Sequence, residues 1–115
     1  MDLKSFGSLG KVEKKIELTK DLSVTVHSLS VVETQKSLAE LPSNLTSDTS
    51  YRGFVMQMAF LVYATSHVNN EAVTLDQAKE FYQNLQTPLF NVAYNEFDSL
   101  AQTQQEALDS LKKKV

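Results

Sequence analysis

The sequence contains no cysteine and no tryptophan, and only two prolines and three glycines in 115 residues. The absence of cysteine excludes disulfides and thiolate metal ligands, and it fits a reducing compartment. Gly7, Gly10 and Gly53 match neither the dinucleotide-binding nor the Walker pattern of phosphate-binding loops. The two histidines, His27 and His67, lie far apart and belong to no metal-binding motif. We therefore predict no metal, no cofactor and no enzymatic activity, and we expect a protein that binds other molecules.

Two short polar segments contain residue types found in catalytic sites, but a structural role explains each of them more simply. Ser66 and His67 are adjacent and could be a nucleophile and its general base. However, adjacent residues on a helix point in different directions. Glu96 and Asp98 look like a pair of acids, but they flank Phe97 and belong on a solvated helix face. These segments indicate hydrogen bonding at a helix end and surface charge, so no catalytic residue is predicted.

Charge and hydropathy restrict the kinds of partner. A net charge of -3 argues against a general affinity for nucleic acid, whose phosphates require a basic face. The longest apolar run, FVMQMAFLVYA from Phe54 to Ala64, is shorter than the roughly 18 residues that a membrane span needs. Residues 1–15 contain no apolar segment of the kind found in a secretory signal. We expect a cytoplasmic protein without a membrane partner, in which the apolar run is a central helix.

Residues 12–26 predict a β-hairpin. Apolar and polar residues alternate on both sides of a short break at Thr19–Asp21, which is typical of two strands and a turn. In this pattern His27 falls on the polar face of the second strand. A lone hairpin is marginally stable in water, so this one must pack on helices or pair its edge with another chain. Residues 1–10 have no clear period and are predicted to be a flexible arm, or else a segment that becomes ordered by contact with a partner.

Capping signals predict four helices after the hairpin. The S-x-x-E box of Ser30 begins a first helix that Pro42 ends. The apolar run forms a second helix to about His67, followed by an Asn-Asn pair that tolerates a left-handed helix end. The T-x-x-Q box of Thr74 begins the third helix. Thr87 caps the fourth helix, with proline at its first position.

The fourth helix is predicted to extend to Lys114 and to carry an apolar seam. Its apolar residues alternate steps of four and three, which is the spacing of a helix face that packs along a partner helix. Beyond about Gln102 the seam becomes more polar, so this part is expected to project from the core as a contact element. Together with the apolar helix, the seam supplies the predicted partner-binding residues, which are Phe54, Met58, Phe90, Tyr94, Phe97, Ala101, Leu108 and Leu111.

The second helix is apolar on nearly all sides, and such a helix must be covered on more than one side. Its surroundings could be a self-sufficient core or other subunits of an oligomer. A third alternative is that one flank forms a groove for an amphipathic helix of another protein. Methionines such as Met58 suit a groove of this kind, because unbranched thioethers repack around different ligands.

These elements predict a single domain, residues 11–115, after the arm of residues 1–10. The predicted fold class is mainly α with an N-terminal β-hairpin (α+β), a small helical bundle with a long C-terminal helix. This order of elements resembles the tail assembly chaperones of long-tailed bacteriophages, including the baseplate hub chaperones. The resemblance covers about residues 11–111 and rests on the segments KVEKKIELTKDLSVTVHSLS, SVVETQKSLAELP, YRGFVMQMAFLVYATSHV, TLDQAKEFYQNL and PLFNVAYNEFDSL.

The resemblance implies a self-associating, helix-rich protein that acts in the cytoplasm of an infected bacterium. Such a protein binds the tape measure protein, or another tail or baseplate component, and keeps it soluble until assembly. The family brings no catalytic residues. Two other functions remain open: a permanent structural subunit of a phage tail, neck or baseplate, present in the virion, and a small regulatory protein that binds a host factor. Salt-sensitive binding would favour the regulatory protein, because salt screens exposed charge pairs more than apolar contacts.

Overall fold

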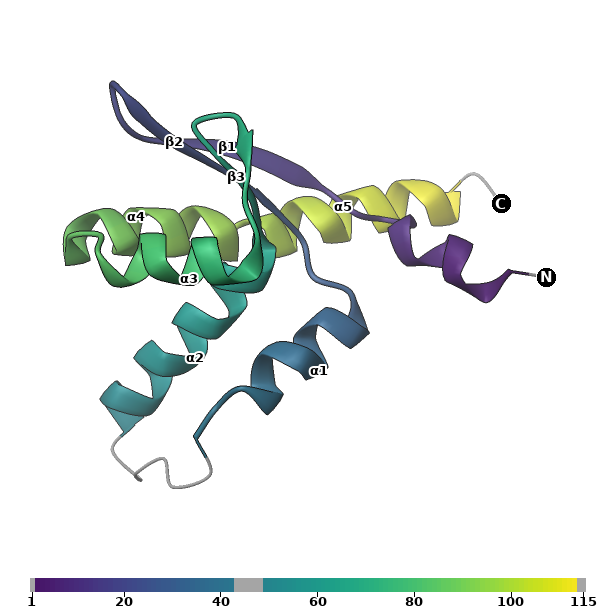
Figure 1. Ribbon diagram of the computed structural model, residues 1–115. Coiled ribbons are helices and arrows are strands. Elements are labelled where there is room, and N and C mark those ends of the chain that lie inside the picture. Colours follow the sequence, from purple (N-terminus) through teal and green to yellow (C-terminus); the bar gives the residue numbers. More distant parts are fainter. Residues whose placement is uncertain (1, 43–48, 114–115) are drawn as a thin grey trace.

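The computed structural model describes residues 2–42 and 49–113, and it combines helices with a small sheet (Figure 1). Its elements in chain order are the 3-10 helix η1 (Leu3–Ser8), β1 (Glu13–Thr19), β2 (Leu22–His27), α1 (Val31–Ala39), α2 (Thr49–Ala64), β3 (Thr65–Val68), β4 (Glu71–Ala72), α3 (Leu75–Gln83), α4 (Thr87–Asp98) and α5 (Leu100–Lys113). The predicted fold class is confirmed. Among the described helices, none combines the length and the hydropathy that crossing a membrane requires.

The four strands form one antiparallel sheet in the order β1-β2-β3-β4. β1 and β2 are the predicted hairpin, and Lys20 and Asp21 join them. The buried side chains of this hairpin's apolar face are those of Ile16, Val24 and Val26. α4 contacts both strands, and Lys14 of β1 forms an ion pair with Glu96 of α4. The hairpin is therefore held on the C-terminal helical segment, as an otherwise marginal hairpin requires.

The apolar helix is shorter than predicted, because α2 ends at Ala64 and the chain continues as strand β3. Asn69 and Asn70 have φ angles of 50° and 68°, so they form the tight turn of a second hairpin and do not end a helix. The Asn69 N–H donates to the Ser23 carbonyl oxygen at 2.9 Å, and the Ser23 N–H donates to Asn69 Oδ1 at 2.8 Å. His67 therefore lies in a strand, and its predicted place at a helix end is wrong.

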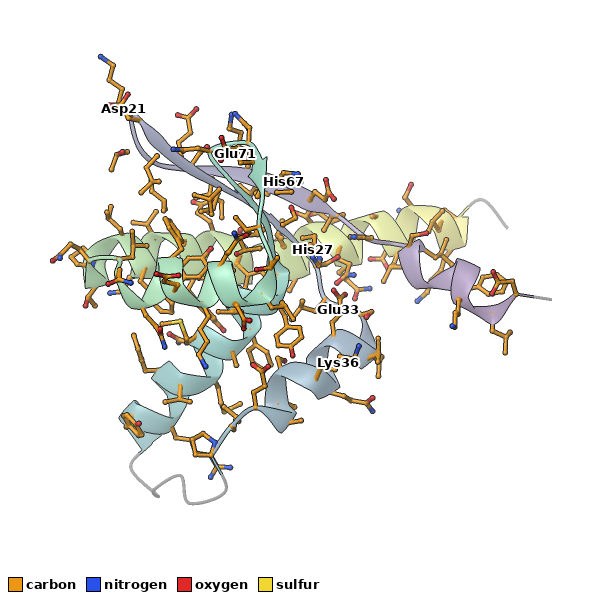
Figure 2. All side chains as sticks on the ribbon, in the orientation of Figure 1. Asp21, His27, Glu33, Lys36, His67 and Glu71 are labelled. Carbon is orange, nitrogen blue, oxygen red and sulfur yellow. The ribbon has the colours of Figure 1, made fainter. Side chains whose placement is uncertain are left out.

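His27 is buried, so its predicted place on a polar strand face is also wrong. The residue is 8% exposed, and its Nδ1 lies 2.7 Å from the Ser28 carbonyl oxygen. The chain turns after β2 and brings the first turn of α1 over the ring, with Glu33 Oε2 at 3.9 Å from Nε2 (Figure 2). Alternation within one strand carries no information about a helix that covers the end of that strand.

The capping boxes of α1 and α3 are confirmed. Ser30 Oγ accepts from the Glu33 N–H at 3.2 Å, and Glu33 Oε1 accepts from the Ser30 N–H at 3.0 Å. Thr74 and Gln77 make the same reciprocal pair at the start of α3. Each box satisfies amide groups that the first helical turn leaves without partners.

The C-terminal helix differs from its prediction at its start and in the middle. Thr87 is already helical, and the N-cap residue is Gln86, which makes no side-chain capping bond. Ser99 separates α4 from α5, and its Oγ donates to the Glu96 carbonyl oxygen at 2.7 Å. Such back-bonding hydroxyls locally disturb helices. The two segments continue in the same direction (Figure 1), and the predicted end at Lys114 lies outside the described residues.

The arm predicted at residues 1–10 contains the 3-10 helix η1, which lies beside the C-terminal part of α5 (Figure 1). Asp2 Oδ1 caps η1 by accepting from the Lys4 N–H at 3.0 Å. Gln104 of α5 donates from Nε2 to the Gly10 carbonyl oxygen at 3.4 Å. The segment before β1 is therefore in contact with α5 at Gly10.

Gly10 is required by this contact. Its φ is 79°, and a Cβ at this position would lie 2.8 Å from Leu108 Cδ2. We expect Gly10→Ala to lower the free energy of unfolding by about 1–2 kcal/mol, because alanine is strained at positive φ and Leu108 must also move. Urea denaturation followed by circular dichroism measures the change. Gly7→Ala is the control, since a Cβ there meets nothing within 4 Å; equal effects of the two substitutions would contradict the contact with Leu108.

The core lies between the sheet and the helices, and Tyr82 of α3 is its largest fully buried side chain. Thr65 Oγ1 donates to the Leu61 carbonyl oxygen at 2.8 Å and lies 2.7 Å from the Tyr82 hydroxyl, with which it forms a hydrogen bond. Burial raises the pKa of Tyr82 to about 12, although the hydrogen bond with Thr65 acts in the opposite direction. The neutral phenol is therefore the form that this core accommodates.

Tyr82 makes the stability of the fold pH-dependent at high pH. Its pKa rises from 10.0 in the unfolded chain to about 12 in the folded one, so its contribution is fully present below pH 10 and is lost as pH rises through about 12. The contribution is roughly 2–3 kcal/mol. Urea denaturation at a series of pH values measures it. Tyr82→Phe should reduce the fall in stability between pH 10 and 12, and an undiminished fall in this variant would contradict the assignment.

Candidate protein-binding surface

The first half of α2 is only partly covered by the rest of the chain. Figure 1 shows α2 running away from the sheet, with α1 beside it. The buried residues of α2 are all near its C-terminal end: Leu61, Val62 and Ala64. Residues 55–60 are half-buried, and Phe54 is 40% exposed. α1, α3 and α4 all contact α2. The uncovered apolar surface of α2 therefore lies between these helices.

One flank forms a groove of about 250 Å³, which we name the α2 groove. Its lining comes from α2 (Phe54, Val55, Met58, Ala59, Val62), from the end of α1 and the residues after it (Glu40, Leu41, Pro42), and from α3 (Lys79, Gln83). The volume is smaller than the roughly 300–1,000 Å³ of typical small-molecule sites. The groove therefore suits one or two apolar side chains of a partner better than a whole cofactor.

Phe54 is held in the groove by the core beneath it. Its ring centroid lies 5.0 Å from that of Phe90, which is 1% exposed. Phe90 in turn packs edge-on against Tyr82, with centroids 6.0 Å apart and ring planes at 86°. Tilted and edge-on arrangements of this kind are the favourable ones for aromatic pairs. The half-exposed Phe54 ring is thus positioned by packed aromatic rings before any partner arrives.

A hydrogen bond connects the wall of the α2 groove to α2. The Tyr63 hydroxyl donates to Glu40 Oε1 at 2.9 Å. Partial loss of hydration raises the pKa of Tyr63, and the hydrogen bond and negative charge of Glu40 raise it further, so the hydroxyl remains a donor at neutral pH. Glu40, at the end of α1, and Lys79 of α3 both line the groove and carry opposite charges. The rim of the groove is therefore electrically asymmetric.

A second hollow of about 240 Å³, which we name the junction groove, lies where α4 meets α5. Phe97, Leu100 and Ala101 line it from this junction, and Phe60 lines it from α2. The Phe97 ring packs edge-on against Tyr94, with centroids 5.9 Å apart. The junction groove thus combines fixed aromatic side chains with an opening to solvent.

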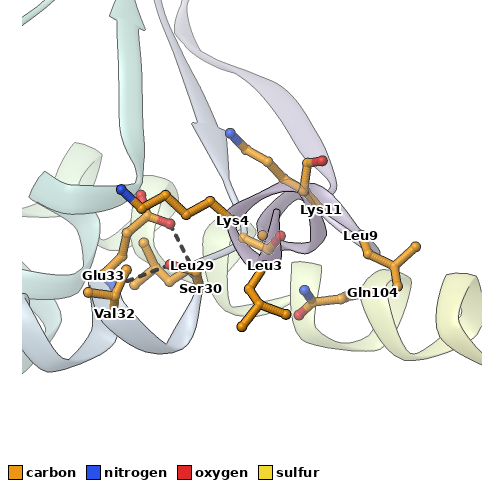
Figure 3. Close-up of a pocket in the computed structure, with 12 residues that line it drawn as sticks. Leu3, Lys4, Leu9, Lys11, Leu29, Ser30, Val32, Glu33 and Gln104 are labelled. Carbon is orange, nitrogen blue, oxygen red and sulfur yellow. Dashed lines mark hydrogen bonds between the residues drawn. The ribbon is translucent and has the colours of Figure 1, made fainter. Parts of the chain in front are cut away.

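A third hollow of about 520 Å³ lies between η1, the start of α1 and α5 (Figure 3). Leu3, Leu9 and Val32 supply apolar surface there, and Lys4 and Glu33 supply charges of both signs. The side chains come from segments far apart in the sequence. This hollow extends the partly apolar surface to the start of α1.

Four of the predicted partner-binding residues line the grooves. Phe54 and Met58 line the α2 groove, and Phe97 and Ala101 line the junction groove. The sequence places these pairs in two different helices, and the fold directs them to two separate hollows. Both hollows border α2.

The other four predicted residues are largely engaged within the molecule. Phe90 is buried in the core, and Tyr94 is half-buried and packs against the core cluster. Leu108 contacts the backbone at Gly10, and Leu111 is 39% exposed. Much of the apolar seam on α4 and α5 is thus covered by the sheet and by the segment before β1.

The structure exposes apolar side chains that the sequence reasoning missed. On α1, Val31 is 76% exposed and Val32 is 53% exposed. In η1 and at the residue that follows it, Leu3, Phe6 and Leu9 are all exposed. A spacing of three could have indicated these last three residues, because a 3-10 helix places every third side chain on one face. For α1, the capping box predicted the helix, but no local signal told which of its sides would remain uncovered.

Ser66 and His67 are closer than predicted. Ser66 Oγ lies 2.7 Å from His67 Nδ1, because the two residues lie in the irregular strand β3 and not on a helix. Ser66 Oγ also lies 3.4 Å from the Thr25 carbonyl oxygen. No carboxylate of the described residues pairs with His67, so the third group that orients a catalytic histidine is not found in this part of the chain.

Within residues 2–42 and 49–113, no group of three or more histidine, aspartate or glutamate side chains is arranged to hold a metal ion. All buried side-chain nitrogen and oxygen atoms in the same ranges have hydrogen-bond partners. Comparisons with protein-family models, curated proteins and solved structures found no match to this chain. The apolar grooves are therefore the features from which a function can be inferred.

Proposed function

We propose that the protein is an assembly chaperone for a bacteriophage tail. It binds the tape measure protein, or another tail or baseplate component, in the cytoplasm of the infected bacterium and keeps this client soluble until assembly. The observation that carries the proposal is the α2 groove, where a half-exposed phenylalanine and a methionine lie on an apolar helix. The order of elements described above supplies the resemblance to this class of protein.

The occupant that best fits the α2 groove is an amphipathic helix. Phe54 and Met58 are one helical turn apart, so they match apolar side chains that are one turn apart on a client helix. Met58 adds adaptability, because its thioether can repack around different side chains. Glu40 and Lys79 on the rim favour one direction of the client helix over the other.

A groove of this size supports reversible binding. It accommodates few side chains, and the polar rim keeps part of each contact in water. When the client reaches its own polymer, the same apolar face becomes buried there, and this competing association releases the chaperone. Chaperone action therefore requires binding and release, and no chemical step.

Co-expression with the tape measure protein encoded in the same genome tests the proposal. We expect the tape measure protein to remain in the soluble fraction with the chaperone and to aggregate without it. We also expect the chaperone to be absent from finished particles. Equal solubility in both cases would contradict the proposal, and presence in the particle would indicate a structural subunit of the tail, neck or baseplate.

A further inference from the structure

β1 lies at one edge of the sheet, in the order β1-β2-β3-β4. Within residues 2–42 and 49–113, its one strand partner is β2, and its other substantial contact is with α4. β1 has 7 residues, whereas β4 at the opposite edge has 2. β1 is therefore the edge of this sheet that is long enough to accept another strand.

The hydrogen-bond pattern identifies the backbone groups that point away from the sheet. The Ser28 N–H donates to the Val12 carbonyl oxygen at 2.9 Å, so Val12 points toward β2. Direction alternates along an antiparallel strand, and the register of β1 with β2 is regular from Glu13 to Glu17. The N–H and C=O groups of Glu13, Lys15 and Glu17 therefore point to the free edge.

The same three residues carry exposed side chains of alternating charge. Charges on an edge strand usually discourage pairing, and a row of one sign would repel a second copy. In a row of alternating sign, each charge can instead face an opposite charge of a second, antiparallel copy, provided that the register of the two strands is suitable. A two-fold axis at Lys15 would place like charges opposite each other, whereas an axis at Ile16 places Lys15 of each copy opposite Glu17 of the other.

We propose that β1 pairs antiparallel with β1 of a second copy, around a two-fold axis at Ile16. Lys15 and Glu17 then form hydrogen-bonded backbone pairs with Glu17 and Lys15 of the other copy, and their side chains form two ion pairs. An axis at Lys14 would also pair opposite charges, but it would place Lys14 of one copy opposite Lys14 of the other. The axis at Ile16 avoids this repulsion and joins the two sheets into one.

A charge reversal and a charge swap test both the surface and the register. The protein is compared with three variants by sedimentation equilibrium over a range of concentrations at low and high salt. We expect a dimer that salt weakens, because the ion pairs lie at an exposed edge. Lys15→Glu should raise the dimer dissociation constant by about tenfold or more, because it replaces two attractive pairs by repulsive ones. The double variant Lys15→Glu/Glu17→Lys should restore dimerisation.

The third variant, Lys36→Glu, makes the same charge change on an exposed position of α1 and should leave the dissociation constant unchanged. Circular dichroism verifies that all variants are folded. A monomer at every concentration would overturn the proposal, as would a dimer that Lys15→Glu leaves intact. A swap that fails to restore the dimer would also overturn it, because opposite charges at these two positions define the proposed register. The assay contains no client, so its outcome is separate from that of the chaperone proposal.

Discussion

Replacing Phe90 with alanine is expected to lower the free energy of unfolding by about 3–5 kcal/mol. Phe90 is 1% exposed and its ring packs against those of Phe54 and Tyr82, so the smaller side chain leaves a cavity where α2, α3 and α4 meet. A loss of this size is a large share of the roughly 5–15 kcal/mol that stabilises a typical domain. Urea denaturation followed by circular dichroism measures it.

Val92→Ala is the matched control for this substitution. Val92 lies on the same helix, but it is 44% exposed, so its truncation should change the free energy of unfolding by no more than about 0.5 kcal/mol. If Phe90→Ala costs less than about 1 kcal/mol, the aromatic contacts between Phe54, Phe90 and Tyr82 are not the centre of the core.

Phe54→Glu is expected to weaken client binding by about thirtyfold or more. Phe54 lines the α2 groove and is 40% exposed, and removing a central aromatic contact commonly costs 2 kcal/mol or more of binding free energy. The carboxylate also introduces a charge that a bound apolar helix would bury. The measurement is the dissociation constant for the tape measure protein, together with its soluble fraction on co-expression.

Two further variants separate this loss from damage to the fold. Phe54→Leu keeps an apolar side chain in the groove and should retain most of the affinity. Gln57→Glu adds the same charge to α2 outside the groove lining and should leave binding unchanged. If Phe54→Glu binds the client as tightly as the unmodified protein, the α2 groove is not the client site.

The sequence predicted correctly those helices and strands that are determined by neighbouring residues in the chain. The first hairpin followed from alternation, and α1 and α3 followed from reciprocal capping boxes that the structure contains. The second hairpin was missed because its strands are short and the preceding apolar run favours a helix. Asn69 and Asn70 indicated positive φ, but only the pairing of β3 with β4 makes them a hairpin turn.

The candidate surface was harder to predict, because exposure depends on which elements cover each other. Met58 and Phe90 have similar hydrophobic character and both lie on apolar helix faces. The fold places Met58 in a groove and Phe90 in the core. Likewise, the spacing of the seam predicted that one face of the C-terminal helix is packed. It did not predict that the segment at Gly10 packs against Leu108. Only the tertiary structure shows whether an apolar helix face packs against another part of the same chain or remains available to another protein.

Hydrogen exchange of the protein, alone and bound to the tape measure protein, tests the central claim most directly. The account predicts slower exchange on binding at residues 54–62 of α2 and at the end of α1, where the α2 groove lies, with little change at the β3–β4 turn. Unchanged exchange at residues 54–62 in a complex that demonstrably contains the client would contradict it.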